Sequence, residues 1–62
     1  MTNRELVRKL KKKGIIFLGH DKKHDVYYNP ATGGEARILR HWTQQVDTGT
    51  LKDILDDLGV TL

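Results

Sequence analysis

The spacing of apolar residues near the N-terminus is that of an amphipathic helix. The apolar residues of this stripe are Leu6, Val7 and Leu10. Thr2 and Glu5 precede the stripe three residues apart, the arrangement of a capping box, in which each side chain accepts a bond from the other residue's backbone N–H. Gly14 follows a run of three lysines and is well placed to end the helix in the left-handed conformation. The sequence therefore predicts a basic helix that begins after Thr2 and ends at Gly14.

Two strand patterns follow in the middle of the chain. Residues 15–18 are apolar and rich in β-branched side chains, which favours a short strand, and the polar residues 19–23 favour a turn. From His24 the period becomes two, so that odd- and even-numbered residues of a second strand face opposite sides. The sequence thus predicts two strands joined by a polar turn.

A second turn and a third strand complete the predicted sheet. The segment 29–34 contains Pro30, which fixes φ, and two glycines, which tolerate positive φ, so we expect a turn there. Residues 35–40 then alternate again, with Ala36 and Ile38 on the side opposite their charged neighbours. This pattern predicts a third strand that runs antiparallel to the second.

The C-terminal segment returns to helical spacing. Its apolar residues are Leu51, Ile54, Leu55 and Leu58. Thr48 or Thr50 is the candidate N-cap, and Gly59 is placed to close the helix. The polar face carries three aspartates, so this helix is acidic where the first one is basic.

The predicted order of elements is helix, strand, strand, strand, helix. Two helices with one apolar stripe each cannot cover both faces of so small a sheet, so we expect both on one face and the other face open. The expected structure is an α+β fold in a single domain over residues 1–62. It has a three-stranded antiparallel sheet with two helices on one face, as in double-stranded-RNA-binding domains.

Length and composition narrow the class of protein. A chain of 62 residues has room for one small domain with a small core. It contains no cysteine, which excludes disulfides and thiolate metal sites and favours the cytoplasm as its location. No apolar run approaches the roughly 20 residues of a membrane span, and the first residues lack the apolar stretch of a signal peptide. We therefore expect no membrane association.

Charge is distributed unevenly along the chain. Residues 1–23 hold eight basic and two acidic side chains, a net charge of +6, whereas residues 24–62 hold three basic and six acidic ones, a net charge of −3. A basic half of this kind suits a polyanion such as RNA. A solvated, lysine-rich helix face is the alternative, and charge alone does not separate the two.

Two histidines with neighbouring aspartates, His20 and His24, have a spacing that would bind a metal ion on a helix. Here the spacing falls on a turn that runs into a strand, and no third ligand accompanies it, so we expect neither a metal nor another cofactor. His24 opens the second strand directly after Lys22 and Lys23. An imidazole in this setting can take the proton from a 2′-hydroxyl that attacks the adjacent phosphorus of RNA. An ordinary surface histidine is the alternative.

Four short motifs occur in order along nearly the whole chain. They read Arg-Glu-Leu-Val at 4–7, Lys-His-Asp-Val-Tyr at 23–27, Leu-Arg-His at 39–41 and Gly-Thr-Leu-Lys-Asp-Ile-Leu at 49–55. In this order and at these spacings, the chain resembles the HicA family of bacterial toxins, small RNA-cleaving proteins with a double-stranded-RNA-binding-domain fold. The resemblance implies a metal-independent endoribonuclease that acts on mRNA. It also implies a HicB-type antitoxin that covers the active site, in a complex that can be oligomeric.

The resemblance assigns roles to individual residues. The family's catalytic histidine stands at the start of the second strand, where this chain has His24, and small residues commonly precede it where this chain has two lysines. Arg40 and His41 match the family's Arg-His pair at the end of the third strand. By their chemistry, Arg40 can grip a phosphate through two nitrogens and His41 can protonate the leaving 5′-oxygen, with a solvated strand end as the alternative. The expected RNA-binding residues are Lys22, Lys23, Arg40, His41, Lys12 and Arg8.

The aromatic residues fit more than one function. Tyr27 and Tyr28 point to opposite faces of their strand, so at most one is free to stack on a base. Trp42 is expected to cover the edge of the core, with base stacking as the alternative. The alternative function is a non-catalytic RNA-binding module of the double-stranded-RNA-binding-domain type, which needs only the basic helix and an extended contact surface. A protein-interaction fragment that uses the acidic last helix is a third possibility.

Overall fold

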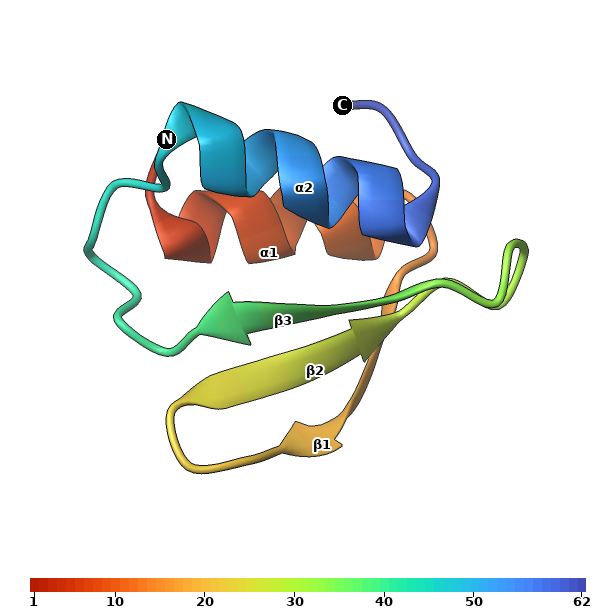
Figure 1. Cartoon of the computed structure of the whole chain (residues 1–62), viewed down its shortest axis with the longest axis horizontal. Coiled ribbons are helices and arrows are strands. Elements are labelled where there is room, and N and C mark those ends of the chain that lie inside the picture. The colour runs from red at the N-terminus through yellow and green to blue at the C-terminus, as the bar shows by residue number, and fades with distance from the viewer.

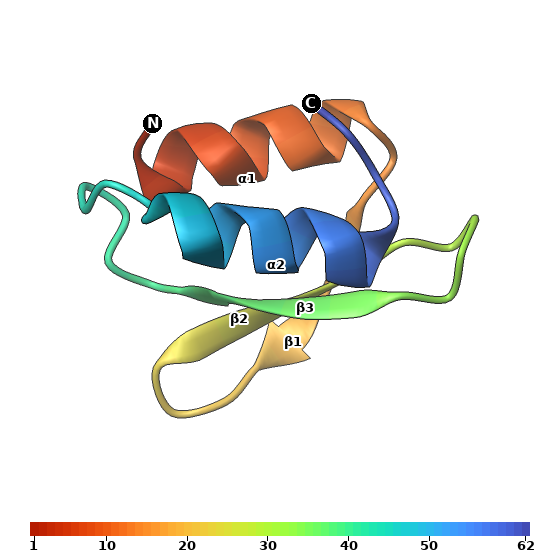
Figure 2. The same ribbon diagram turned by 45° about the horizontal axis from the view of Figure 1, so that its top comes forward.

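The computed structural model describes all 62 residues of the chain. Its elements are α1 (Asn3–Lys12), β1 (Ile16–His20), β2 (His24–Tyr28), β3 (Glu35–Leu39) and α2 (Thr48–Leu58). The three strands form an antiparallel sheet in the order β1-β2-β3. Both helices cover the same face of this sheet and leave the other uncovered (Figures 1 and 2). The predicted α+β fold and its order of elements are confirmed.

The capping box and the glycine stop of α1 form as the sequence predicts. The Thr2 hydroxyl accepts a bond from the Glu5 N–H at 3.2 Å, and the Glu5 carboxylate accepts one from the Thr2 N–H at 3.0 Å. The hydrogen bonds that the Glu5 carboxylate accepts, from the Thr2 N–H and from the Thr2 hydroxyl, lower the pKa of Glu5 below its usual value. Gly14 follows the helix with a φ of +87°, a conformation that favours glycine.

The N-cap of α2 differs from the prediction. Asp47 caps this helix, because its carboxylate accepts a hydrogen bond from the Thr50 N–H at 3.2 Å. The predicted threonine cap at position 48 or 50 is therefore wrong. A carboxylate at this position also interacts favourably with the positive end of the helix dipole. Gly59 ends the helix in the left-handed conformation, as predicted.

The core lies between the helices and the sheet and is small. Its nine buried hydrophobic residues are Leu6, Val7, Leu10, Ile15, Tyr27, Ala36, Ile38, Ile54 and Leu58. Trp42 is half-buried against this core, which confirms its expected place at the edge. Neither helix has the length and apolar character needed to cross a bilayer.

The first strand is shifted from its predicted position. Ile15 is not part of β1, since its N–H donates to the Leu10 carbonyl beyond the end of α1 and its side chain is buried in the core. The strand continues instead to His20, with an irregular register between Phe17 and Gly19. The predicted turn over residues 19–23 therefore shortens to the three residues 21–23.

The loop between β2 and β3 is anchored to the end of α2. The Asn29 side-chain amide is buried and donates to the Leu58 carbonyl at 2.8 Å, and the Thr32 hydroxyl donates to the same oxygen at 2.9 Å. These bonds satisfy a carbonyl that the helix leaves without a partner at its end. A Cβ at Gly34 would overlap the Asp57 carbonyl, so only glycine allows this close approach of loop and helix.

Candidate active site on the turn between β1 and β2

The register of the sheet places His24 on the uncovered face. His24 lies opposite Leu39, and the next pair along the ladder is Asp25 with Ile38. Ile38 is buried beneath the helices, and side chains alternate along a strand, so His24 and Leu39 point to the face that no helix covers. The ring stands at the first position of β2, beside the turn, and its side chain is 40 % exposed.

Asp21 holds the turn in front of His24. Its Oδ1 accepts a hydrogen bond from the His24 backbone N–H at 3.1 Å and lies 3.7 Å from the ring Nδ1. The bond from the His24 N–H, with further contributions from the Lys23 N–H and the charge of Arg37, lowers the pKa of the Asp21 carboxyl below its usual value. A stable negative charge beside Nδ1 favours a proton on that nitrogen. The other ring nitrogen, Nε2, makes no hydrogen bond and no ion pair.

Arg40 fastens the same turn from the other side. Its Nη2 donates to the Lys22 carbonyl at 2.6 Å and to the Asp21 carbonyl at 3.2 Å. Its Nε lies 3.7 Å from a carboxylate oxygen of Asp25, and its backbone N–H donates to the Lys23 carbonyl at 3.0 Å. The structure therefore uses Arg40 to position the turn. Of the three guanidinium nitrogens, only Nη1 has no protein partner and can contact a phosphate. The sequence alone predicts that Arg40 binds a phosphate through two nitrogens.

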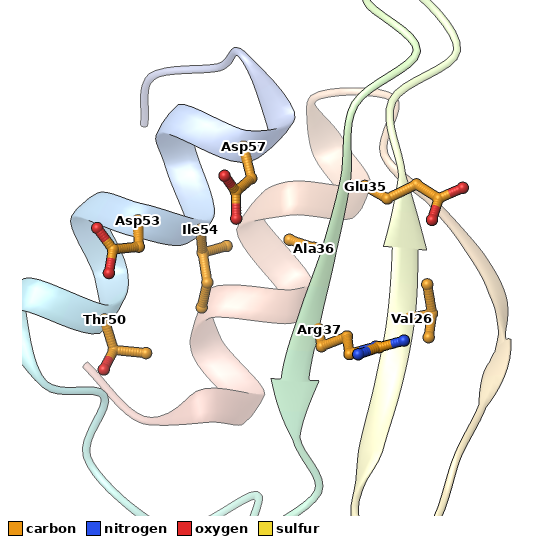
Figure 3. A pocket seen from close by; sticks show the side chains of 8 residues that line it. All are labelled: Val26, Glu35, Ala36, Arg37, Thr50, Asp53, Ile54 and Asp57. Atoms are coloured by element: carbon orange, nitrogen blue, oxygen red, sulfur yellow. The ribbon is translucent and has the colours of Figure 1, made fainter.

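Arg37 belongs to the site, although the sequence analysis did not select it. It lies opposite Val26 on the uncovered face, and its Nε is 3.4 Å from Asp21 Oδ2. Its side chain is 69 % exposed. Figure 3 shows Arg37 reaching from β3 toward Val26 of β2, whereas Asp53 and Asp57 lie on α2. The alternation of β3 was the signal that could have found it, because Arg37 is the charged residue between the two buried positions 36 and 38.

Lys22 and Lys23 are both exposed on the turn beside His24. Together with Asp21 and His24 they line a shallow hollow in the surface. Neither lysine is held in an ion pair, so their ammonium groups are available to an anion in front of the ring. The structure thus brings together four of the predicted residues, because Arg40 also contacts this turn.

The remaining predicted residues lie elsewhere. His41 follows Arg40 in the connector to α2, and its Nδ1 is 3.3 Å from the side-chain oxygen of Gln44. Arg8 and Lys12 are exposed on α1, in the layer that covers the face opposite His24. The C-terminal end of α1 also lies at the end of the molecule opposite this turn (Figure 1). The basic helix and the turn are therefore two separate basic surfaces.

This arrangement has the parts of a general base. An imidazole with a carboxylate on one side and a free nitrogen on the other can accept a proton and be stabilised once charged. No three histidine, aspartate or glutamate side chains gather where they would hold a metal ion. Comparison with models of known families, with curated proteins and with solved structures finds no match for this chain. The resemblance to HicA toxins therefore rests on the sequence motifs alone.

Proposed function

We propose that this protein is a metal-independent endoribonuclease of the HicA type that cleaves mRNA at the turn between β1 and β2. The observation that carries the proposal is the position of Asp21, 3.7 Å from His24 Nδ1, with Nε2 free and two unpaired lysines alongside. A general base, its stabilising carboxylate and an anion-attracting surface are thereby combined within four consecutive residues.

The proposed reaction uses the 2′-hydroxyl of RNA as the nucleophile. Nε2 of His24 takes the hydroxyl proton, and the 2′-oxygen forms a bond to the adjacent phosphorus. The bond from phosphorus to the 5′-oxygen breaks, and that oxygen leaves with a proton taken from water, since His41 lies in the connector to α2 and not on this turn. The products are a 2′,3′-cyclic phosphate and a 5′-hydroxyl. Asp21 stabilises the imidazolium that forms, and Lys22 and Lys23 attract the phosphodiester.

The proposal includes a protein that holds the toxin inactive. An antitoxin of the HicB type would cover His24 and place carboxylates opposite Lys22 and Lys23. Charge pairing of this kind mainly speeds association and fixes orientation. Such a complex, oligomeric or not, would operate in the cytoplasm, where mRNA is available.

The test is cleavage of a single-stranded RNA by the purified protein in excess EDTA, followed by identification of the new ends. We expect 2′,3′-cyclic phosphate ends from the wild type, none from His24→Ala, and normal cleavage by His20→Ala. His20 is the matched control because it is also exposed, stands close by, and contacts only the Asp21 carbonyl, at 3.4 Å. RNA that is bound but left intact would instead indicate a non-catalytic binding module. Cleavage that requires a divalent cation would contradict the proposed chemistry.

A further inference from the structure

The outer edge of β1 is apolar and unpaired. Ile16, Phe17 and Leu18 are 47 %, 49 % and 52 % exposed, and they follow one another on a strand at the edge of the sheet. No backbone group of residues 16–20 bonds to any segment other than β2. Exposed edge strands are normally protected from pairing with another chain by a charge, a proline or a bulge. Residues 15–19 contain no charged residue and no proline, and the bulge between Phe17 and Gly19 leaves Ile16 and Phe17 in regular register with β2. This edge is therefore open to an additional strand.

A hollow with a basic rim lies next to this edge, on the helix side of the sheet. Phe17 and Tyr27 meet edge to face in its wall, with ring centroids 5.8 Å apart, and Val7 and Trp42 complete the apolar lining. The charged residues around it are Arg4, Lys11 and Asp25. Arg40 pairs with Asp25, but neither Arg4 nor Lys11 has a carboxylate within ion-pair distance. The hollow thus combines an apolar floor with two unpaired cations.

We propose that β1 accepts a strand from an acidic partner protein. An extended segment would bond through its backbone to the outer edge of β1 and place one apolar side chain in the hollow. Side chains of an added strand alternate between the two faces of the sheet, so residues two positions before and after the apolar one share its face, and carboxylates there can reach Arg4 and Lys11. The occupant is thus an extended peptide segment in which every second residue faces the hollow, with an apolar residue in the middle and an acidic residue on either side of it.

Charge and chemistry distinguish this occupant from two others. A second copy of the chain would present its own β1, which has no acidic residue, and would bring together two N-terminal regions with a net charge of +6 each. RNA has no peptide groups to pair with the strand edge and would leave Ile16 and Leu18 exposed to water. The proposal holds whether or not the protein cuts RNA, because the hollow and His24 lie on opposite faces of the sheet.

The first test is a titration with a synthetic valine–glutamate peptide, Thr-Glu-Thr-Val-Thr-Glu-Thr, in which the valine and both glutamates share one face of an extended strand. Trp42 is the only tryptophan of the chain and lines the hollow, so its fluorescence reports binding. We expect a saturable change in Trp42 fluorescence with this peptide and none with a valine–lysine peptide in which lysines replace both glutamates. Amide hydrogen exchange should slow in residues 16–20, which separates strand addition from mere contact. No saturable change with the valine–glutamate peptide would overturn the proposal.

Variants locate the bound segment. The double variant Arg4→Gln/Lys11→Gln should bind the valine–glutamate peptide with about three- to tenfold lower affinity, as expected for the loss of two exposed ion pairs. Ile16→Lys should also lower the affinity for this peptide. Leu62→Lys is the control and should not change it, because Leu62 is comparably exposed, at 44 %, but lies in the C-terminal tail. Equal binding by all variants would overturn the proposal. So would protection of residues 16–20 by oligouridine, or by self-association without peptide.

Discussion

The two turns of the sheet are held in opposite ways. The loop at 29–34 is fastened from the inside, by an Asn29 side chain that is 5 % exposed and bonds to the end of α2. The turn at 21–23 is fastened from the outside, by Arg40, Arg37 and Asp21, all of which contact solvent. A hydrogen bond in the interior leaves a costly unpaired group when it is broken, whereas water replaces an exposed one. We therefore expect the loop to carry stability and the turn to carry chemistry.

The largest expected effect is on the chemistry of the turn. His24→Ala should reduce RNA cleavage by a factor of about 10²–10⁴, the usual loss when a general base is removed. The thermal melt should remain nearly unchanged, because the ring is exposed and its nearest partner is 3.7 Å away. The measurement is cleavage at equal concentrations of folded protein, together with the melt. A large drop in melting temperature would show that the turn carries stability after all.

The second-largest effect is expected from Arg40→Lys, which should reduce RNA cleavage by up to about 100-fold. A small displacement of a reacting group, here His24 on the turn, causes a loss of this size. Lysine keeps the charge but cannot reproduce the planar set of contacts that Arg40 makes with the turn. Stability should change little, since exposed charged contacts contribute about 0–1 kcal/mol. Arg8→Lys, an exposed position on α1, is the matched control and should cleave normally. Equal rates for the two variants would deny Arg40 a positioning role.

At the other turn, Asn29→Ala should lower the free energy of unfolding by about 1–3 kcal/mol, because it removes a buried bond to the Leu58 carbonyl. Cleavage measured well below the melting temperature should be unaffected. Thr32→Val removes the neighbouring bond to the same oxygen from a more exposed residue, and we expect a smaller loss. Chemical denaturation measures both variants. If Asn29→Ala abolished cleavage in folded protein, the two turns would not be independent.

The lysines of the turn should give a smaller, salt-dependent effect. The affinity for single-stranded RNA falls as the salt concentration rises, and a plot of log affinity against log salt concentration has a slope of about −0.7 per contacted phosphate. The double variant Lys22→Ala/Lys23→Ala should therefore make this slope less steep by about 1.4. The control is Lys9→Ala with Lys13→Ala, which removes two charges from the end of α1. If only the control changed the slope, RNA would bind to α1 and not to the turn, as in a double-stranded-RNA-binding module.

The smallest expected effect concerns Asp21 and depends on pH. The folded protein lowers the pKa of this carboxyl from its ordinary value of 3.8, so the ionised form stabilises the fold. That stabilisation is fully present above the ordinary value and is lost as the pH falls through the lowered pKa. Asp21→Asn should therefore be less stable than the wild type at neutral pH, and the difference should shrink in acid. Denaturation curves of both proteins at neutral and at acidic pH test this. A difference in stability that stays the same at the two pH values would contradict it.

The features that depend on local periodicity were predictable from the sequence. The stripe of α1 is buried, as its spacing indicates, and Ala36 and Ile38 are buried between exposed charged residues of β3. The glycine stops at Gly14 and Gly59 were also predictable, because few other residues adopt positive φ. Each of these signals lies within a few residues of the feature that it predicts.

The features that depend on contacts between distant segments were not predictable in the same way. Residues 16–18 are uniformly apolar, so they indicate a strand but not that it lies at an exposed edge. The partners of Arg40 depend on the pairing of His24 with Leu39, which brings the end of β3 beside the turn. The basic residues of 1–23 look continuous in the sequence, yet the fold divides them between α1 and the turn.

Neighbouring peptide groups of the turn are bonded on both sides of the backbone. The Lys22 carbonyl accepts a hydrogen bond from Arg40 Nη2, and the Lys23 carbonyl accepts one from the Arg40 backbone N–H. The His24 N–H, which belongs to the same peptide group as the Lys23 carbonyl, donates to the Asp21 carboxylate. A change at either Arg40 or Asp21 therefore shifts the backbone that the other residue holds. The effects of Arg40→Lys and Asp21→Asn should consequently be non-additive in a double-mutant cycle, although the two side chains act on opposite sides of the backbone.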